Sequence, residues 1–275
     1  MKVEVLISTM NRKDYSFIDN MNLNSDFLII NQNCEEFRSE KLFGLNKGRI
    51  ISLDEKGLSK SRNLAIQNST ADICILADDD VSYINNYSEI VCDAYKKYCD
   101  ADIIAFQMHR IGTKRSKVYR NEQSWENYIS CVKISSVEIT FKRESIINSK
   151  IKFNELMGSG SEFYLGEENI FLCDALKKGL KILYLPIKIG CVDCSKSTWF
   201  EGYNSKYFIS RGALFYNMSN IYYIFLIIQF AIRKYNLYNY NLSFFKVIIF
   251  MIEGVKKYKS YKKIISNDND IELLT

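Results

Sequence analysis

The sequence predicts an α/β protein with a mixed, mostly parallel sheet flanked by helices and with a C-terminal helical extension. Two observations support this: short apolar runs alternate with amphipathic segments through most of the chain, and a basic, apolar tail follows them. With 275 residues, 47% of them hydrophobic, the chain can bury a large core. We expect the sheet domain to span residues 1–212 and the helical region to span residues 213–275.

The expected strands are short runs rich in Val, Ile, Leu and Phe. They cover residues 3–8, 26–30, 49–53, 73–77, 102–106, 137–141, 181–185 and 187–192. Residues 58–66 are expected to form a helix leading into the strand at 73, which gives a parallel sheet with right-handed crossovers. A second helix is indicated by apolar residues at helical spacing, at 90, 91, 94, 95 and 98.

Three consecutive acids, Asp78, Asp79 and Asp80, follow the apolar run at residues 73–77. The run is typical of a strand buried on both faces, and ligands of open α/β sheets bind at the carboxyl ends of such strands. Adjacent carboxylates repel one another, so the cluster indicates a site for a hard cation, Mg²⁺ or Mn²⁺. The alternative is a solvated acidic turn.

The first strand ends in polar residues that include Thr9, Asn11 and Arg12, and no glycine follows it. This argues against a P-loop, a dinucleotide-binding fingerprint and the glycine-rich loop of sugar-nucleotide pyrophosphorylases. A nucleotide bound here must therefore be held by side chains. The second strand also ends in amides, beginning with Asn31.

Two basic residues, Lys60 and Arg62, lie near the start of the expected helix, on the side where the strand ends converge. They are either ligand contacts or ordinary solvated side chains.

A second acidic pair, Glu167 and Glu168, follows a loop with glycines at 158, 160 and 166 and begins an amphipathic helix. Acids in the first turn of a helix stabilise its dipole, and one would be enough. Two indicate a catalytic carboxylate. The chain has one histidine, His109, so a metal site with several histidines is excluded. Catalysis of the Ser-His-Asp or Cys-His type would have to use His109.

The eight cysteines are scattered without a disulfide framework, and the start MKVEVLIS shows no signal-peptide pattern, so we expect a cytoplasmic protein. Cys191 and Cys194 form a lone pair whose spacing is better explained by chance than by a zinc site. The hydroxyls, lysine and tryptophan of residues 195–199 are compatible with a lid over phosphates or with an ordinary connection.

The basic charge is concentrated in the tail. Residues 233–263 carry eight Lys or Arg and one acid, whereas the net charge of the whole chain is +5. Phe, Ile and Tyr are interleaved with these cations, which suits an anionic membrane surface and not nucleic acid. The apolar run at 221–232 is shorter than the roughly 20 residues needed to span a bilayer. It is expected to lie on a membrane or to pack on the sheet domain.

Four motifs in this order resemble the family 2 glycosyltransferases, over roughly residues 3–235. The motifs are VLISTMNR, GLSKSRNLAIQNSTADICILADDDV, GSGSEFYLGEEN and STWFEGYNSKYFISRGALFY. The resemblance implies a GT-A fold, a divalent metal held by a D-x-D element, and transfer from a nucleotide-sugar, usually with inversion.

The resemblance also implies roles for individual residues. Asp78 and Asp80 match the metal-binding D-x-D, with Asp80 preferred as the direct ligand, and Glu168 matches the catalytic base, with Glu167 as the alternative. The expected contacts to the nucleotide-sugar are Thr9, Asn11, Arg12, Asn31, Lys60, Arg62, Asp79 and Trp199.

The sequence departs from the family pattern in two places. The amides at 31–33 replace an Asp-rich turn, and Asp193 and Cys194 stand where many members have a histidine.

The expected function is therefore metal-dependent sugar transfer to a saccharide or lipid-linked acceptor in cell-surface polysaccharide assembly, on the inner face of the membrane, with Mn²⁺ or Mg²⁺ as cofactor. Sugar transfer of this kind needs a cation for the leaving diphosphate and a carboxylate for the proton of the acceptor. The alternatives are a membrane-peripheral interaction protein with a decayed site and a nucleotidyltransferase of related topology.

Overall fold

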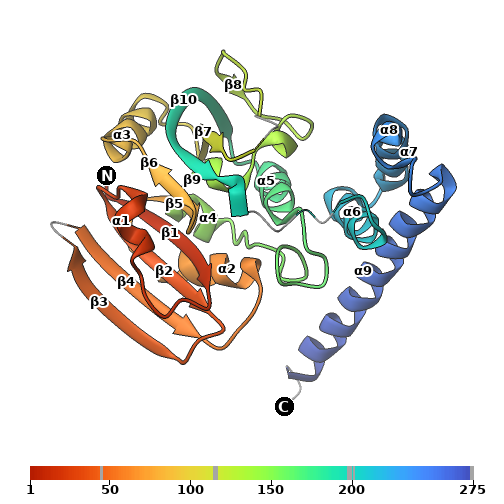
Figure 1. Ribbon diagram of the computed structural model, residues 1–275, viewed down its shortest axis with the longest axis horizontal. Helices are drawn as coiled ribbons and strands as arrows, with labels where there is room; N and C mark the ends of the chain where they lie inside the picture. Colours follow the sequence, from red (N-terminus) through yellow and green to blue (C-terminus); the bar gives the residue numbers. More distant parts are fainter. Residues whose placement is uncertain (44–45, 114–116, 197–199, 201, 273–275) are drawn as a thin grey trace. The chain divides into compact units, whose positions relative to one another are not determined.

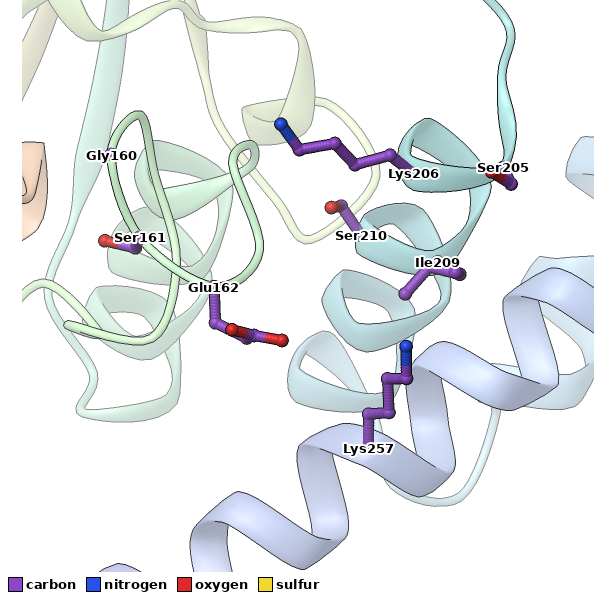
Figure 2. Close-up of a pocket in the computed structure, with 8 residues that line it drawn as sticks. All are labelled: Gly160, Ser161, Glu162, Ser205, Lys206, Ile209, Ser210 and Lys257. Carbon is purple, nitrogen blue, oxygen red and sulfur yellow. The ribbon is translucent and has the colours of Figure 1, made fainter.

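A computed structural model describes residues 1–43, 46–113, 117–196, 200 and 202–272 (Figure 1). The chain divides into two compact units. The first comprises Met1–Glu155 and Glu167–Ser197, and the second comprises Leu156–Gly166 and Thr198–Thr275. The boundary expected at residue 212 falls inside helix α6 (Ser205–Met218), which belongs as a whole to the second unit. The glycine-containing loop before Glu167 also joins the second unit.

The first unit is built on one sheet, which has ten strands in the described part of the chain. Its strand order is β3-β4-β2-β1-β5-β9-β7-β10-β6, with β8 paired to β10. The strands are β1 (Val3–Met10), β2 (Asp26–Gln32), β3 (Phe37–Phe43), β4 (Asn46–Leu53), β5 (Ile73–Asp78), β6 (Val81–Tyr83), β7 (Ile103–Ile111), β8 (Ser124–Trp125), β9 (Ile139–Lys142) and β10 (Ile182–Asp193).

The sheet is mixed and mostly parallel, as expected. Strands β4, β2, β1 and β5 are parallel neighbours, and β7 is parallel to β10. Strand β9 lies antiparallel between β5 and β7. In register, Thr9 pairs with Asn31, and the neighbouring Ser8 pairs with Asp78. Because parallel strands end at the same edge, the polar residues that follow β1, β2 and β5 gather there.

Helices cover both faces of this sheet (Figure 1). The helices of the first unit are α1 (Phe17–Met21), α2 (Leu58–Asn68), α3 (Tyr87–Lys97), α4 (Arg143–Asn148) and α5 (Glu167–Lys177). The predicted stripe of α3 is confirmed, because Val91, Ala94 and Tyr95 are buried in the same core cluster as Val3, Val5 and Ile7 of β1. These β1 residues alternate along the strand, so α3 lies on one face of the sheet.

Two details of the sheet differ from the expectation. The strands predicted on either side of Pro186 form one strand, β10, whose register with β7 shifts between Tyr184 and Lys188. Proline has no N–H to donate to a ladder, so the strand continues through an irregularity. Strand β3 was not expected, because its sequence FRSEKLF is polar, as is typical of an edge strand.

The second unit is helical in its C-terminal part and contains α6, α7 (Tyr223–Arg233), α8 (Tyr235–Tyr238) and α9 (Phe244–Glu272). None of the helices traced in residues 1–43, 46–113, 117–196 and 202–272 is long and apolar enough to cross a membrane. Helices α6 and α9 pack at very short range. A Cβ added to Gly212 would overlap the carbonyl of Met251, and one added to Gly254 would overlap the carbonyl of Ile209.

Gly212→Ala should destabilise the protein, although alanine favours a helix by about 1 kcal/mol over glycine. The new methyl group meets backbone, which cannot rotate away, and overpacking of this kind costs about 1–3 kcal/mol or more. Urea unfolding of Gly212→Ala and of Gly254→Ala measures the effect. Ser260→Ala, at an exposed position of the same helix α9, is the control and should leave stability unchanged or slightly higher. A gain in stability for Gly212→Ala would contradict the close crossing.

Candidate active site

The first acidic cluster lies where β5 ends and the chain turns into β6. Asp79 is held by Thr9, near the end of β1, and by Arg12, just after this strand. Its Oδ2 accepts hydrogen bonds from Thr9 Oγ1 at 2.5 Å and from Arg12 Nη2 at 2.6 Å and Nε at 2.9 Å. The cation of Arg12 thus offsets one of the three negative charges. The structure brings together Thr9, Arg12 and Asp79, three of the residues predicted to contact the nucleotide-sugar.

Asp78 is paired with a different arginine. Arg62 Nη2 donates to Asp78 Oδ1 at 3.3 Å, and Arg62 Nη1 donates to Glu167 Oε1 at 2.8 Å. The guanidinium also lies over the ring of Phe153, at 5.5 Å from its centroid. Arg62 is only 2% exposed. Its guanidinium therefore joins the two acidic clusters in the interior of the first unit, away from solvent. Burial acts to lower the pKa of Arg62, but the nearby carboxylates of Asp78 and Glu167 outweigh it and raise the pKa.

Asp80 is the acid of the cluster that remains exposed. No ion pair among the described residues reaches its carboxylate. Desolvation, followed by the negative charges of Asp78 and Asp79, raises the pKa of Asp80 to about 7. The two arginines pair with Asp78 and Asp79, so Asp80 is the acid of the cluster that neither arginine neutralises, and its raised pKa means that it takes up a proton near neutral pH.

The two glutamates at the start of α5 are in different surroundings. Glu167 is buried and fixed by Arg62, whereas Glu168 is half-buried. The charge of Glu168 acts on both Arg62 and Lys117, so this carboxylate lies in a basic environment. A partly exposed carboxylate can exchange a proton with a bound molecule, and a carboxylate locked in a buried ion pair cannot do so readily.

A buried pair next to this region was not identified from the sequence. Lys117 Nζ donates to both oxygens of Glu138, at 2.7 and 2.5 Å, and to the backbone oxygen of Lys133 at 2.6 Å. Burial lowers the pKa of Lys117, and the charge of Glu138 opposes this. Lys117 and Glu138 are 21 positions apart and belong to no motif, so the sequence offered no signal for the pair.

Asn31, on β2, holds the backbone of Arg12 by hydrogen bonds. Its side chain is fully buried; Nδ2 donates to the backbone oxygen of Arg12 at 2.8 Å, and Oδ1 accepts from the backbone N–H of Arg12 at 3.1 Å. Asn31 therefore fixes the backbone that carries Arg12. Asn11 is exposed in a left-handed conformation with φ 58°, and Lys60 is half-buried on α2. Trp199 lies outside the described residues.

The donor set at the end of β5 fits a hard divalent cation. All candidate ligands are carboxylate oxygens, and Asp80 and Asp78 are the residues that would hold the ion. No group of three or more Asp, Glu, His or Cys side chains converges within the part of the chain that the structure describes. Mg²⁺ is commonly held by one or two carboxylates together with substrate phosphates.

Comparison with known proteins gives a family for the part of the chain that carries half of the candidate site residues. Residues 30–165 match the family described as Glycosyl transferase family 2. The match includes Arg62 and the three aspartates and ends just before Glu167. No curated protein sequence matches the chain.

Solved structures share the fold. The chain matches S. aureus TarS 1-349 with 12% identity and a TM-score of 0.59, over 88% of this chain and 74% of that one. The same protein in complex with UDP-GlcNAc gives a TM-score of 0.62, with the same identity and coverage. Its complex with UDP gives 0.57 at 13% identity.

The strand order, the helices on both faces of the sheet and these structural matches confirm the expected GT-A fold. Residues 30–165 belong to glycosyl transferase family 2, and the protein is a glycosyltransferase.

Proposed function

We propose that the enzyme transfers a sugar from a nucleoside diphosphate sugar to a hydroxyl of a saccharide or lipid-linked acceptor, with Mn²⁺ or Mg²⁺ and with inversion. The observation that carries the proposal is the Arg62 bridge, which ties the acids after β5 to the acids that start α5. Diphosphate departure and proton removal need acidic groups held at a fixed separation, and a buried guanidinium that donates to one carboxylate of each cluster supplies such a constraint.

The donor would lie at the carboxyl edge of the sheet. TarS structures hold UDP-GlcNAc and UDP, which supports a uridine nucleotide here. Thr9, Asn11, Arg12 and Lys60 are the side chains proposed to contact the nucleotide. Arg12 is 44% exposed even while it pairs with Asp79, so part of its guanidinium remains free to meet an anionic ligand.

A divalent cation bound by Asp80 and Asp78 would neutralise the charge that develops on the leaving diphosphate. Asp79 is oriented toward Thr9 and Arg12 and is proposed to contact the ribose or the donor sugar. Without a ligand, the three carboxylates repel one another. Arg12 and Arg62 reduce this repulsion by pairing with Asp79 and Asp78.

Glu168 is proposed as the general base that takes the proton of the acceptor hydroxyl. Its partial exposure leaves the carboxylate accessible to a bound acceptor, in the neighbourhood of the cations Arg62 and Lys117. Glu167 would position α5 through Arg62. A single displacement with a base on the side opposite the leaving group inverts the anomeric centre. We place the reaction in cell-surface polysaccharide assembly, on the cytoplasmic side of the membrane.

Asp80→Asn should weaken the metal-dependent part of UDP binding at least about tenfold, because a neutral amide is a poor ligand for Mn²⁺. The fold should persist, since the change removes repulsion from the cluster. Titration calorimetry with UDP, with and without Mn²⁺, measures the effect. Asp93→Asn, at an exposed position on α3, is the matched control. Undiminished metal-dependent binding by Asp80→Asn would show that the metal lies elsewhere.

Glu168→Gln should bind UDP normally but transfer sugar at least about a hundredfold more slowly, as is usual when a general base is lost. The neighbour Glu167→Gln serves as the comparison and should mainly lower stability, because Arg62 loses a buried partner. Turnover of folded enzyme with a UDP-sugar and a hydroxyl acceptor separates the two. Normal turnover by Glu168→Gln together with its loss in Glu167→Gln would exchange the two roles.

Arg62→Met should destabilise the protein by about 3–5 kcal/mol, because the buried carboxylate of Glu167 loses its cation. Guanidinium unfolding measures the change, and Arg38→Met, at an exposed position, is the control. Adding Glu167→Gln to Arg62→Met should recover part of the loss, since the unpaired charge is then removed. If the two changes are additive, Arg62 and Glu167 do not interact as the structure shows.

A further inference from the structure

Helix α7 of the second unit packs through one side only. Its residues Ile227, Phe230 and Ala231 are buried, and the ring of Phe230 lies 5.5 Å from the ring of Phe215 on α6. These contacts bury the inward face of the helix. Apart from Gln229 and Arg233, the outward side of α7 is apolar too.

The outward face of α7 is an exposed apolar stripe. Ile224, Phe225, Ile228 and Ile232 recur at helical spacing, with exposed fractions of 51, 68, 42 and 62%. Ile221 and Tyr222, just before the helix, are 76 and 67% exposed. Exposed apolar residues are normal singly, but a continuous stripe on one helix face indicates a binding surface.

Helix α9, which packs against α7, begins with the same pattern. Phe245 and Ile249 lie one turn apart and are 75 and 62% exposed. By helical spacing the same face continues to Lys256 and Lys263, both exposed. We define the apolar face as Ile221, Ile224, Phe225, Ile228, Ile232, Phe245 and Ile249.

The charges around the apolar face are predominantly positive, because the first acid on α9, Glu253, is paired with Lys257. Residues 202–252 contain no Asp or Glu, whereas Arg233 and Lys246 are exposed and follow or adjoin the stripe. An apolar surface with a cationic border is complementary to the headgroup region of an anionic bilayer, where apolar side chains insert and cations meet lipid phosphates.

We propose that the apolar face docks on an anionic lipid surface, with α7 and the first turns of α9 lying in the interface and with Arg233 and Lys246 at the phosphates. A second copy of the chain fits this face less well. A two-fold dimer through the same surface would bring the excess cations of both copies together, because Glu253, the acid on this part of α9, is already paired with Lys257. The docking is independent of the proposed sugar transfer, because none of its residues belongs to the candidate active site.

The test is co-sedimentation of the full-length protein with vesicles of phosphatidylcholine and phosphatidylglycerol, at low salt and without nucleotide or metal. The wild type should bind, and binding should weaken in high salt and with vesicles of phosphatidylcholine alone. Phe225→Ser and Phe245→Ser should each lower partitioning at least about tenfold, because one aromatic anchor is lost. Arg233→Gln and Lys246→Gln should each lower it about fivefold.

Ile129→Ser is the matched control, since Ile129 is 81% exposed on the first unit and should not affect partitioning. All the altered side chains are exposed, so circular dichroism should show unchanged folding. A wild type that stays in solution, or Phe225→Ser that binds like the wild type, would overturn the proposal. Sedimentation equilibrium completes the test: a dimer that Phe225→Ser dissociates, without vesicle binding, would assign the face to a second copy.

Discussion

The buried guanidinium of Arg62 is the interaction on which the candidate site depends. It is 2% exposed and pairs with Asp78 after β5 and with Glu167 at the start of α5. The buried carboxylate of Glu167 needs this cation, because the desolvation of an unpaired charge costs several kcal/mol, whereas the side chain of Asp78 is 36% exposed. The arginine thus determines where the first turn of α5 lies relative to the end of β5, and with it the position of Glu168.

The three consecutive aspartates differ in the cations that lie beside them. Arg62 pairs with Asp78, Arg12 pairs with Asp79, and Asp80 is left with a pKa raised to about 7. Asn31 contributes indirectly to the pairing of Asp79, because it holds the backbone of Arg12. Identical side chains therefore have different properties, set by burial and by the distance to each cation.

The two units satisfy different physical demands. The first is a sheet covered on both faces, so its apolar runs are buried. In the second, Gly212 and Gly254 allow α6 and α9 to approach backbone to backbone, while the apolar face remains exposed. Helix α7 buries Ile227, Phe230 and Ala231 and presents isoleucine and phenylalanine on its other side, and this exposed side is the one proposed to dock on lipid.

The sequence by itself determined the α/β class, most strand positions, the stripe of α3, and both acidic clusters, because hydrophobic periodicity and runs of like charge are local properties. It could not give the polar edge strand β3 or the unit boundary, which depend on pairing and packing partners distant in the chain. Only the tertiary structure showed that Arg62 bridges two clusters 89 positions apart, that Asn31 is buried, and that Lys117 pairs with Glu138. The reason is physical: whether a charged side chain is solvated or buried against a partner is set by what the fold places beside it, not by its neighbours in sequence.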